Sequence, residues 1–335
     1  MQLSALDLIS RPKAKSLGQA YQDSVQLAQA LDQMGYQRIW YAEHHGSNTH
    51  GSSAPEILAA YIAAATQKIR VGTGGTMIMH YSPLKVAEVF KSIATLAPDR
   101  VDLGIGRAPG GGPEAIYALG QGDPHWPDDL YQKTATILQL ISEEERTDPL
   151  YQRIEASPRG LDYLPQAWML GSSGNSAAYT GRLGMGYSFA KFFGVKAPDD
   201  IFTHYRQNFR PSAFHQEAQT MSTYMVIAAD SKEEADYQAK ALEIARFEQA
   251  QNRFNPILSA EEAADIKLSA QAQQFIQEQS KRRILVKGSA EEVRDILLEE
   301  KERYQFDEIM VYTPLADQAA RRRSYQLIYD HLAQA

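Results

Sequence analysis

The chain has 335 residues, no cysteine and a formal net charge of −7, from 34 basic and 41 acidic side chains. The lack of cysteine excludes disulfides, thiolate nucleophiles and cysteine metal sites, and the acidic balance argues against nucleic acid as the main partner. We find no apolar run long enough to cross a bilayer and no N-terminal signal pattern. We therefore expect a cytoplasmic protein that does not bind membranes.

Apolar runs typical of buried strands alternate with amphipathic helix patterns along the whole chain. Eight strands are expected, near residues 6–9, 38–42, 69–73, 101–105, 167–170, 187–189, 224–227 and 308–312. Helical periodicity follows each of them, as in the pattern of residues 17–31 after the first strand. This order favours an α/β fold, a (β/α)8 TIM barrel built as one domain over residues 1–335, rather than a doubly wound sheet.

Two stretches do not fit the simple repeat. Residues 108–127 hold three consecutive glycines and three prolines, which predicts an ordered loop on the barrel rim. Residues 246–285 are polar and helix-prone, with Ser259 and Glu262 spaced as a capping box. Because insertions after late barrel strands lie on the active-site side, we expect this segment to be a helical lid; a solvated helical pair is the alternative.

The second expected strand ends in Glu43-His44-His45. Catalytic residues of TIM barrels lie where strands meet the following loops. Histidine suits proton transfer there because its unperturbed pKa lies near neutral pH. We therefore predict His44 to be an acid–base residue.

Metal binding by Glu43 and the neighbouring histidines is the alternative. Adjacent strand residues point to opposite faces, so His44 and His45 do not easily bind one ion, and we expect no metal. For His50 and His125 we expect surface or packing roles. His80 follows the third strand closely enough to be a secondary candidate for the pocket.

A phosphate cradle is predicted at Gly171-Ser172-Ser173-Gly174-Asn175-Ser176, between a strand and a helix. Free backbone N–H groups and the helix dipole favour an anion there, and Ser172, Ser173 and Ser176 add hydroxyl donors. An ordinary serine-capped turn is the alternative. Arg107 ends the fourth strand, which neighbours the fifth in a barrel, so we expect it to complete a phosphate clamp.

Residues 72–76 read Gly-Thr-Gly-Gly-Thr at the end of the third strand. Adjacent glycines remove side chains where a flat group could press against the backbone, so Gly74 and Gly75 are candidates for a cofactor site. A plain bulge is the alternative.

In combination these motifs resemble the bacterial luciferase-like family of flavin-dependent monooxygenases, in particular its single-gene bacterial oxidoreductases. The matching segments cover residues 40–45, 69–75, 82–88, 98–107 and 171–173. The similarity is dense from residue 1 to about 112 and thinner through Gly184 and residues 288–312. Two departures from true luciferases concern light emission and a long-chain aldehyde substrate, and leave the barrel and the flavin site intact. Gly106 is cysteine in some true luciferases, and the segment of residues 146–167 is short for a luciferase subunit.

The resemblance implies a barrel that binds FMN, often reduced by a separate reductase, and that acts as a homodimer on a small organic substrate and O2. By position, His44 would be the acid–base residue. Arg107, Ser172, Ser173 and Ser176 would hold the phosphate. Thr73, Gly74 and Gly75 would run along the flavin ring, at a bond that is often a non-prolyl cis peptide in this family.

Reduced flavin reacts with O2 to give a peroxyflavin, which survives only where water is excluded. Apolar walls for such a pocket are expected from Trp40, Tyr41, Met77, Ile78, Met79 and Phe189. Three other functions stay open. They are a deazaflavin-dependent oxidoreductase of the same fold, a flavin-binding protein without turnover, and, well behind these, a metal-dependent hydrolase.

Overall fold

The computed structural model describes residues 1–107, 109–123, 129–171, 173–194, 196 and 198–333. Within these residues, ten strands form one sheet. Their bounds are β1 Gln2–Asp7, β2 Arg38–Tyr41, β3 Arg70–Thr73, β4 Thr76–Met77, β5 Val101–Gly106, β6 Gln166–Gly171, β7 Gly186–Ala190, β8 Thr220–Ala229, β9 Leu285–Ser289 and β10 Glu308–Tyr312.

Eight of these strands close into a parallel barrel in the order β1, β2, β3, β5, β6, β7, β8 and β10. β10 pairs with both β8 and β1, which completes the ring. The predicted TIM barrel is therefore confirmed, and its strands are those that the apolar runs indicated.

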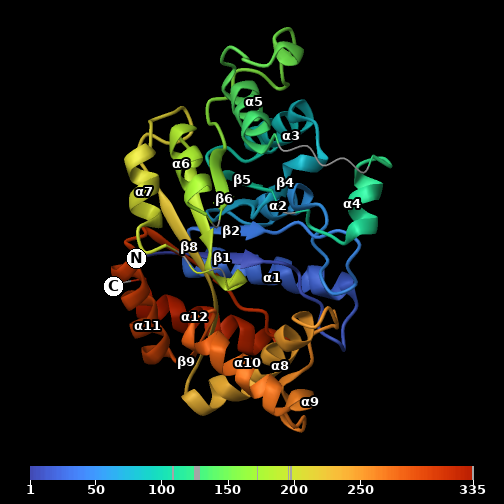
Figure 1. Ribbon diagram of the computed structural model, residues 1–335, viewed down its shortest axis with the longest axis vertical. Coiled ribbons are helices and arrows are strands. Elements are labelled where there is room, and N and C mark those ends of the chain that lie inside the picture. The colour runs from blue at the N-terminus through green and yellow to red at the C-terminus, as the bar shows by residue number, and fades with distance from the viewer. Residues whose placement is uncertain (108, 124–128, 172, 195, 197, 334–335) are drawn as a thin grey trace.

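Helices surround the barrel, as Figure 1 shows. Their bounds are α1 Leu17–Met34, α2 Pro55–Ala65, α3 Pro83–Leu96, α4 Pro113–Leu119, α5 Leu130–Ser142, α6 Gly174–Arg182, α7 Ile201–Asn208, α8 Lys232–Gln249, α9 Ala260–Ala264, α10 Ala270–Lys281, α11 Ala290–Tyr304 and α12 Gln318–Leu332. In the described part of the chain, none of them is both long and apolar enough to cross a membrane. The two chain ends meet at one side, where the Met1 amino group donates to the Ala333 carbonyl at 3.0 Å.

The sheet differs from the expected one at two places. β8 is ten residues long: its first half pairs with β7 and β10, and its second half pairs with β9 outside the ring. β1 begins at Gln2, four residues earlier than expected. Neither extension is visible in local periodicity, because both exist only through pairing with strands that are distant in the chain.

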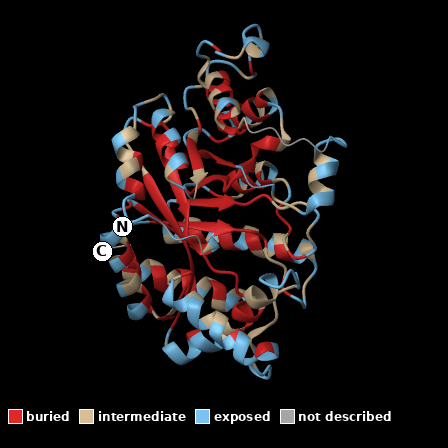
Figure 2. Cartoon of the chain, viewed as in Figure 1, coloured by how far each residue is buried: buried red, intermediate tan, exposed pale blue. Residues whose placement is uncertain are grey.

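Two apolar clusters fill the two layers. One lies inside the barrel and includes Trp40, Trp168 and Met310, and the other lies between the strands and the helices. Side chains alternate between the layers along each strand, so Trp40 belongs to the inner cluster while Tyr41 belongs to the outer one. The buried strands and the exposed outer faces of the helices are distinguished in Figure 2.

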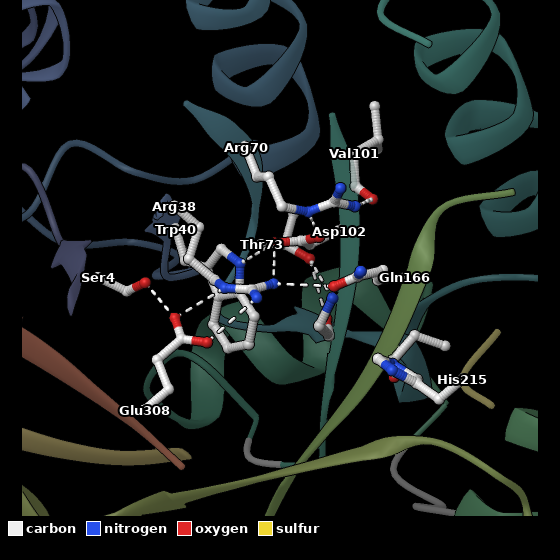
Figure 3. A network of polar contacts seen from close by, with 12 residues as sticks. Ser4, Arg38, Trp40, Arg70, Thr73, Val101, Asp102, Gln166, His215 and Glu308 are labelled. Carbon is white, nitrogen blue, oxygen red and sulfur yellow. Dashed lines mark hydrogen bonds and ion pairs between the residues drawn. The ribbon is translucent and has the colours of Figure 1, made fainter. Parts of the chain in front are cut away.

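A buried ionic network lies at the amino-terminal end of the barrel strands (Figure 3). The Arg38 guanidinium donates to Glu308 at 2.9 and 3.1 Å and to Asp102 at 2.8 Å. Asp102 also accepts from Arg70 at 2.8 Å and from the Trp40 indole at 2.9 Å. Burial alone would raise the pKa of Asp102, but the two guanidinium groups outweigh it and lower that pKa. The network therefore joins four strands below the rim.

The barrel needs glycine where β3 meets β5. A Cβ on Gly104 would lie 1.9 Å from the Thr73 carbonyl oxygen, and one on Gly72 would lie 2.5 Å from the Asp102 carbonyl oxygen. Only glycine allows these backbones to approach so closely, and the approach sets the position of Thr73 at the rim.

Candidate active site

The loop after β2 carries the predicted acid–base residue. Its backbone is fixed by two hydrogen bonds, from His44 N to the Ser52 carbonyl at 2.7 Å and from His45 N to the Gly110 carbonyl at 2.6 Å. These bonds anchor the loop to the segment before α2 and to the glycine run before α4. His44 is thereby held at the carboxyl end of β2, as predicted.

The His44 imidazole lines a pocket of about 660 Å³ at this end of the barrel. Its Nδ1 atom is buried and has no hydrogen-bond partner in the described structure. Burial, and then the nearby His50 and His45, lower the pKa of His44 to about 3. The ring is therefore neutral at neutral pH, and one of its nitrogens is buried without a partner among the described residues.

His45 and Glu43 serve a different purpose from His44. The Glu43 carboxylate is fully buried, and it accepts from the Met77 backbone N–H at 2.9 Å and from the Tyr81 hydroxyl at 2.7 Å. The His45 Nε2 atom lies 2.6 Å from the same carboxylate. These contacts tie the loop after β2 to the end of β4 and to the segment that follows it.

Glu43 is thus engaged within the protein, which removes the main ligand of the metal-dependent alternative. Among the described residues, no three His, Asp or Glu side chains come together as a metal site. His50 stacks on His44 in the pocket wall, which is the packing role of the two roles expected for it. The His80 Nε2 atom contacts the Pro109 carbonyl at 2.7 Å, and this ring does not line the pocket. His125 lies outside the described residues.

The Gly74–Gly75 peptide bond is cis. Thr73 is buried, and its hydroxyl donates to the Gly104 carbonyl at 2.9 Å. A Cβ on Gly74 would meet Leu6 at 2.9 Å, and one on Gly75 would meet the Gly106 backbone nitrogen at 2.9 Å. Protein atoms therefore fill much of the space that these glycines leave, so packing within the barrel accounts for them in part.

The predicted phosphate cradle forms the beginning of α6. Ser173 and Ser176 make a reciprocal capping box, and the Ser176 hydroxyl also lies 3.2 Å from the Tyr187 hydroxyl. The two side chains thus stabilise the start of the helix, while the backbone N–H groups of Gly174 and Asn175 make no hydrogen bond with a described residue. Ser172 lies outside the described residues.

Arg107 is exposed directly after β5. β5 and β6 are paired, with Ile105 opposite Met169, so the ends of these strands are neighbours on the rim. Arg107 therefore follows a strand that neighbours the strand before α6; that Arg107 and the start of α6 form one phosphate clamp stays a prediction.

Apart from His44 and His45, the pocket is lined largely by residues that the sequence did not single out. The expected apolar walls at Trp40, Tyr41, Met77, Ile78, Met79 and Phe189 are not part of the lining, and this prediction was wrong. Trp40 packs deeper in the barrel and several of the others face the helices, as strand alternation requires. The lining instead includes three aromatic residues at or shortly after strand ends, Phe192, Phe193 and Tyr312. It also includes the beginning of the polar insertion, with Arg246, Gln249, Phe254, Asn255 and Ile257.

The start of the predicted helical lid, residues 246–285, therefore borders the pocket. Ile257 is bound by backbone hydrogen bonds to both sides of Pro12, from its N–H to the Arg11 carbonyl at 3.0 Å and from the Lys13 N–H at 2.7 Å. α9 begins with the expected capping box of Ser259 and Glu262. Whether this segment opens and closes as a lid stays a prediction.

A family model described as luciferase-like monooxygenase matches residues 1–307. The chain belongs to the luciferase-like monooxygenase family. It is therefore an oxidoreductase of the oxygen-incorporating class, and the resemblance predicted from its motifs is confirmed.

Similar proteins cover the chain almost completely. The uncharacterized protein YceB of Bacillus subtilis is 36% identical over 97% of this chain and 97% of its own length. A luciferase-like monooxygenase of Escherichia coli is 32% identical over 98% of this chain and 96% of its own length. An N-acetyl-S-alkylcysteine monooxygenase of Bacillus subtilis is 31% identical over 98% of both chains.

Solved structures show the same barrel. Apo-MsnO8 is similar with a TM-score of 0.86 and 30% identity over 98% of both chains. The FMN complex of the oxygenating constituent of 3,6-diketocamphane monooxygenase from Pseudomonas putida has a TM-score of 0.71 at 17% identity, over 100% of this chain and 98% of its own. An F420-dependent secondary alcohol dehydrogenase has a TM-score of 0.67 at 14% identity, over 97% of both chains. The last two show the fold alone.

Proposed function

We propose that this protein is a flavin-dependent monooxygenase that uses reduced FMN and O2 to oxidise a small organic substrate, with His44 as its acid–base residue. The observation that carries the proposal is the state of His44, which lines a pocket at the carboxyl ends of the strands, is neutral, and has a buried Nδ1 atom without a hydrogen-bond partner among the described residues. A buried polar atom without a partner is costly in a folded protein, and a ligand in the pocket would satisfy it.

The residues near the β5 and β6 ends fit the phosphate of FMN. Arg107 supplies a guanidinium, and the N–H groups of Gly174 and Asn175 point out of the first turn of a nine-residue helix. We propose that Ser173 and Ser176 act by holding this first turn in place, and that Ser172 adds a further donor. Thr73, Gly74 and Gly75 would border the ring of the cofactor.

Bound reduced flavin would supply the electrons and the activation of O2. The chain contributes a site that limits water and a group that accepts protons. The segment of residues 250–257, held against Pro12, borders the pocket and restricts its opening. Because burial lowers the pKa of His44 to about 3, its ring enters the reaction neutral and not as an imidazolium.

Comparing FMN with riboflavin tests the cofactor assignment. Wild-type protein should bind FMN more tightly than riboflavin, and Arg107→Gln should weaken FMN binding by about 10- to 100-fold, the effect of a lost charge-assisted hydrogen bond, while leaving riboflavin binding unchanged. Arg182→Gln, at the exposed far end of α6, is the matched control. Absence of FMN binding to wild-type protein, with binding of the deazaflavin F420, would replace this proposal by the deazaflavin-dependent alternative.

We further propose that a separate reductase supplies the reduced flavin and that the chain acts as a homodimer. Sedimentation of the purified protein tests the second point. Turnover with photochemically reduced FMN, compared with oxidised FMN and NADH, tests the first, because a chain with its own reductase activity would need no external reduction.

A further inference from the structure

The pocket that contains His44 has an unusual charge for a protein of net charge −7. Not one of the described residues that line it is aspartate or glutamate, whereas the lining includes Arg246 and three histidines. Three buried carboxylates lie close to the lining residues in the chain, and each is bound to a partner within the protein: Glu43 to the Met77 N–H, Asp7 to Arg321 and Glu243 to Lys287. Arg246 is therefore the one arginine or lysine of the described lining, and no carboxylate lines the pocket beside it.

Arg246 extends from the last turn of α8 into this lining and is half-buried. Its Nε and Nη2 atoms donate to the Gln279 side-chain oxygen at 3.3 and 3.0 Å, and Nη2 also donates to the Phe192 carbonyl at 3.3 Å. Among the described residues, Nη1 has no hydrogen-bond partner and no carboxylate forms an ion pair with this guanidinium. Burial lowers the pKa of Arg246, as expected for a cation without a counter-ion.

The other deeply placed arginines differ from Arg246 in this respect. Arg38 is paired with Asp102 and Glu308, and Arg321 is paired with Asp7 at 2.9 Å. A partly desolvated cation is costly unless an anion compensates it. Gln279 and the Phe192 carbonyl hold Arg246 in position but leave its charge uncompensated, so the guanidinium is oriented for an anion that comes from outside the chain.

The rest of the lining is suited to an organic body rather than to a small inorganic ion. Phe192 and Phe193 lie with ring centroids 4.4 Å apart, and Leu242 and Met225 add aliphatic surface. Phe193 and Phe254 are 67% and 58% exposed at the mouth, which is more than large apolar side chains usually are. A volume of about 660 Å³ is that of a pocket for a small organic molecule.

We infer that the substrate of this site is an organic acid, whose anionic group is bound by Arg246 and whose apolar part lies against the phenylalanines between Arg246 and His44. The inference rests on the proposed function, since it names the substrate class of the proposed oxygenation. Arg246 is then a specificity residue, and the position of the apolar part in the same pocket as His44 decides which carbon or heteroatom is oxidised.

Binding of matched probes tests the inference without turnover. Phenylacetate and phenylacetamide have the same shape and differ in charge, and their affinities for the FMN-loaded protein are measurable by calorimetry. We expect phenylacetate to bind at least 10-fold more tightly in the wild type, and this preference to disappear in Arg246→Gln. Arg246→Lys keeps the positive charge but lacks the planar guanidinium with its paired donors, so it should retain part of the preference for phenylacetate.

Arg253→Gln is the control, because Arg253 is exposed in the loop directly after α8 and is not part of the pocket lining. Equal loss of preference in Arg253→Gln and Arg246→Gln would indicate a diffuse field and overturn the inference. Equal affinity of the wild-type protein for the two probes would also overturn the inference. The same holds if the flavin-free protein binds phenylacetate and FMN abolishes this binding, because Arg246 would then bind the cofactor. FMN affinity measured on the same samples separates these results from failure of the proposed function, which would show as absence of FMN binding.

Discussion

The imidazole rings of His44 and His50 are stacked in the pocket wall, with centroids 4.8 Å apart and planes inclined by 21°. The His50 Nδ1 atom lies 3.1 Å from the Thr49 hydroxyl, which fixes the orientation of the outer ring. Burial lowers the pKa of His50 to about 4, so neither ring is charged at neutral pH. The stack therefore gives the predicted acid–base residue a rigid and neutral support.

His50→Phe should raise the pKa of His44 while keeping the aromatic contact. Burial is the larger cause of the lowered pKa and remains in the variant, so the pKa should stay below 6.5. Histidine-specific NMR over pH 3–7 measures both proteins. An unchanged His44 pKa in the variant would show that the two rings do not interact electrostatically.

His44→Asn should leave FMN affinity within about twofold of wild type and should reduce turnover by about 10²- to 10⁴-fold, the usual contribution of a general acid–base group. His204→Asn, on α7 and away from the pocket, is the control for loss of a histidine. Stopped-flow absorbance during reoxidation of photoreduced FMN provides a second measurement. A spectroscopic transient that precedes full reoxidation in the wild type should be altered in His44→Asn. Full turnover by this variant would contradict the assigned role and favour a flavin-binding protein without His44 chemistry.

The free energy of unfolding should decrease as the pH falls from about 6.5 to 4. His44, His50 and His215 have folded pKa values lowered to about 3, 4 and 4, in each case mainly by burial. The unfolded chain therefore binds more protons than the folded chain below pH 6.5, and each histidine contributes at most about 1.4 kcal/mol per pH unit. Urea denaturation at several pH values measures the slope. His215→Gln should reduce it, and a slope of zero in the wild type would contradict the prediction.

Arg38→Met should destabilise the fold by about 3–5 kcal/mol, because it leaves Glu308 and part of Asp102 buried without their cation. Denaturant unfolding measures the loss. Arg294→Met is the matched control: it breaks the exposed pair of Arg294 with Asp295 and should change stability by less than about 1 kcal/mol. Similar effects of the two substitutions would mean that the network at the amino-terminal end of the barrel does not contribute to stability.

Gly104→Ala should destabilise the barrel by about 3 kcal/mol or more, since its Cβ would lie 1.9 Å from the Thr73 carbonyl oxygen. Gly18→Ala adds the same methyl group in α1, where the only contact within 4 Å is with Ser16 at 3.9 Å. That substitution should be neutral or stabilising by up to about 1 kcal/mol, through the loss of chain entropy in the unfolded state. Thermal unfolding of both variants compares them directly, and equal effects would argue against the close approach of β3 and β5.

Chain order and apolar periodicity were sufficient to predict the barrel, because each strand is a short apolar run and each helix has a clear amphipathic pattern. They were also sufficient to place His44 and Arg107 at strand ends, since the barrel geometry puts all such ends on one rim. β9 and the early start of β1 could not be predicted in this way. These segments become strands only by pairing with β8 and β10, and the pairing partners are not adjacent in the chain.

The pocket itself was decided by the tertiary structure. Its lining residue Arg246 lies in a polar helical pattern that is typical of a solvated face, and His50 was indistinguishable from a surface histidine. Both residues reach the pocket because α8 and the loop after β2 come together over the open end of the barrel. The direction of a loop cannot be read from the residues next to it in the chain, and neither can the lack of a counter-ion for a charged side chain. Local periodicity and motif spacing in the sequence alone determined the fold class, the family and the candidate site residues at strand ends. The charge and the lining residues of the pocket arise instead from contacts between segments about 200 residues apart in the chain.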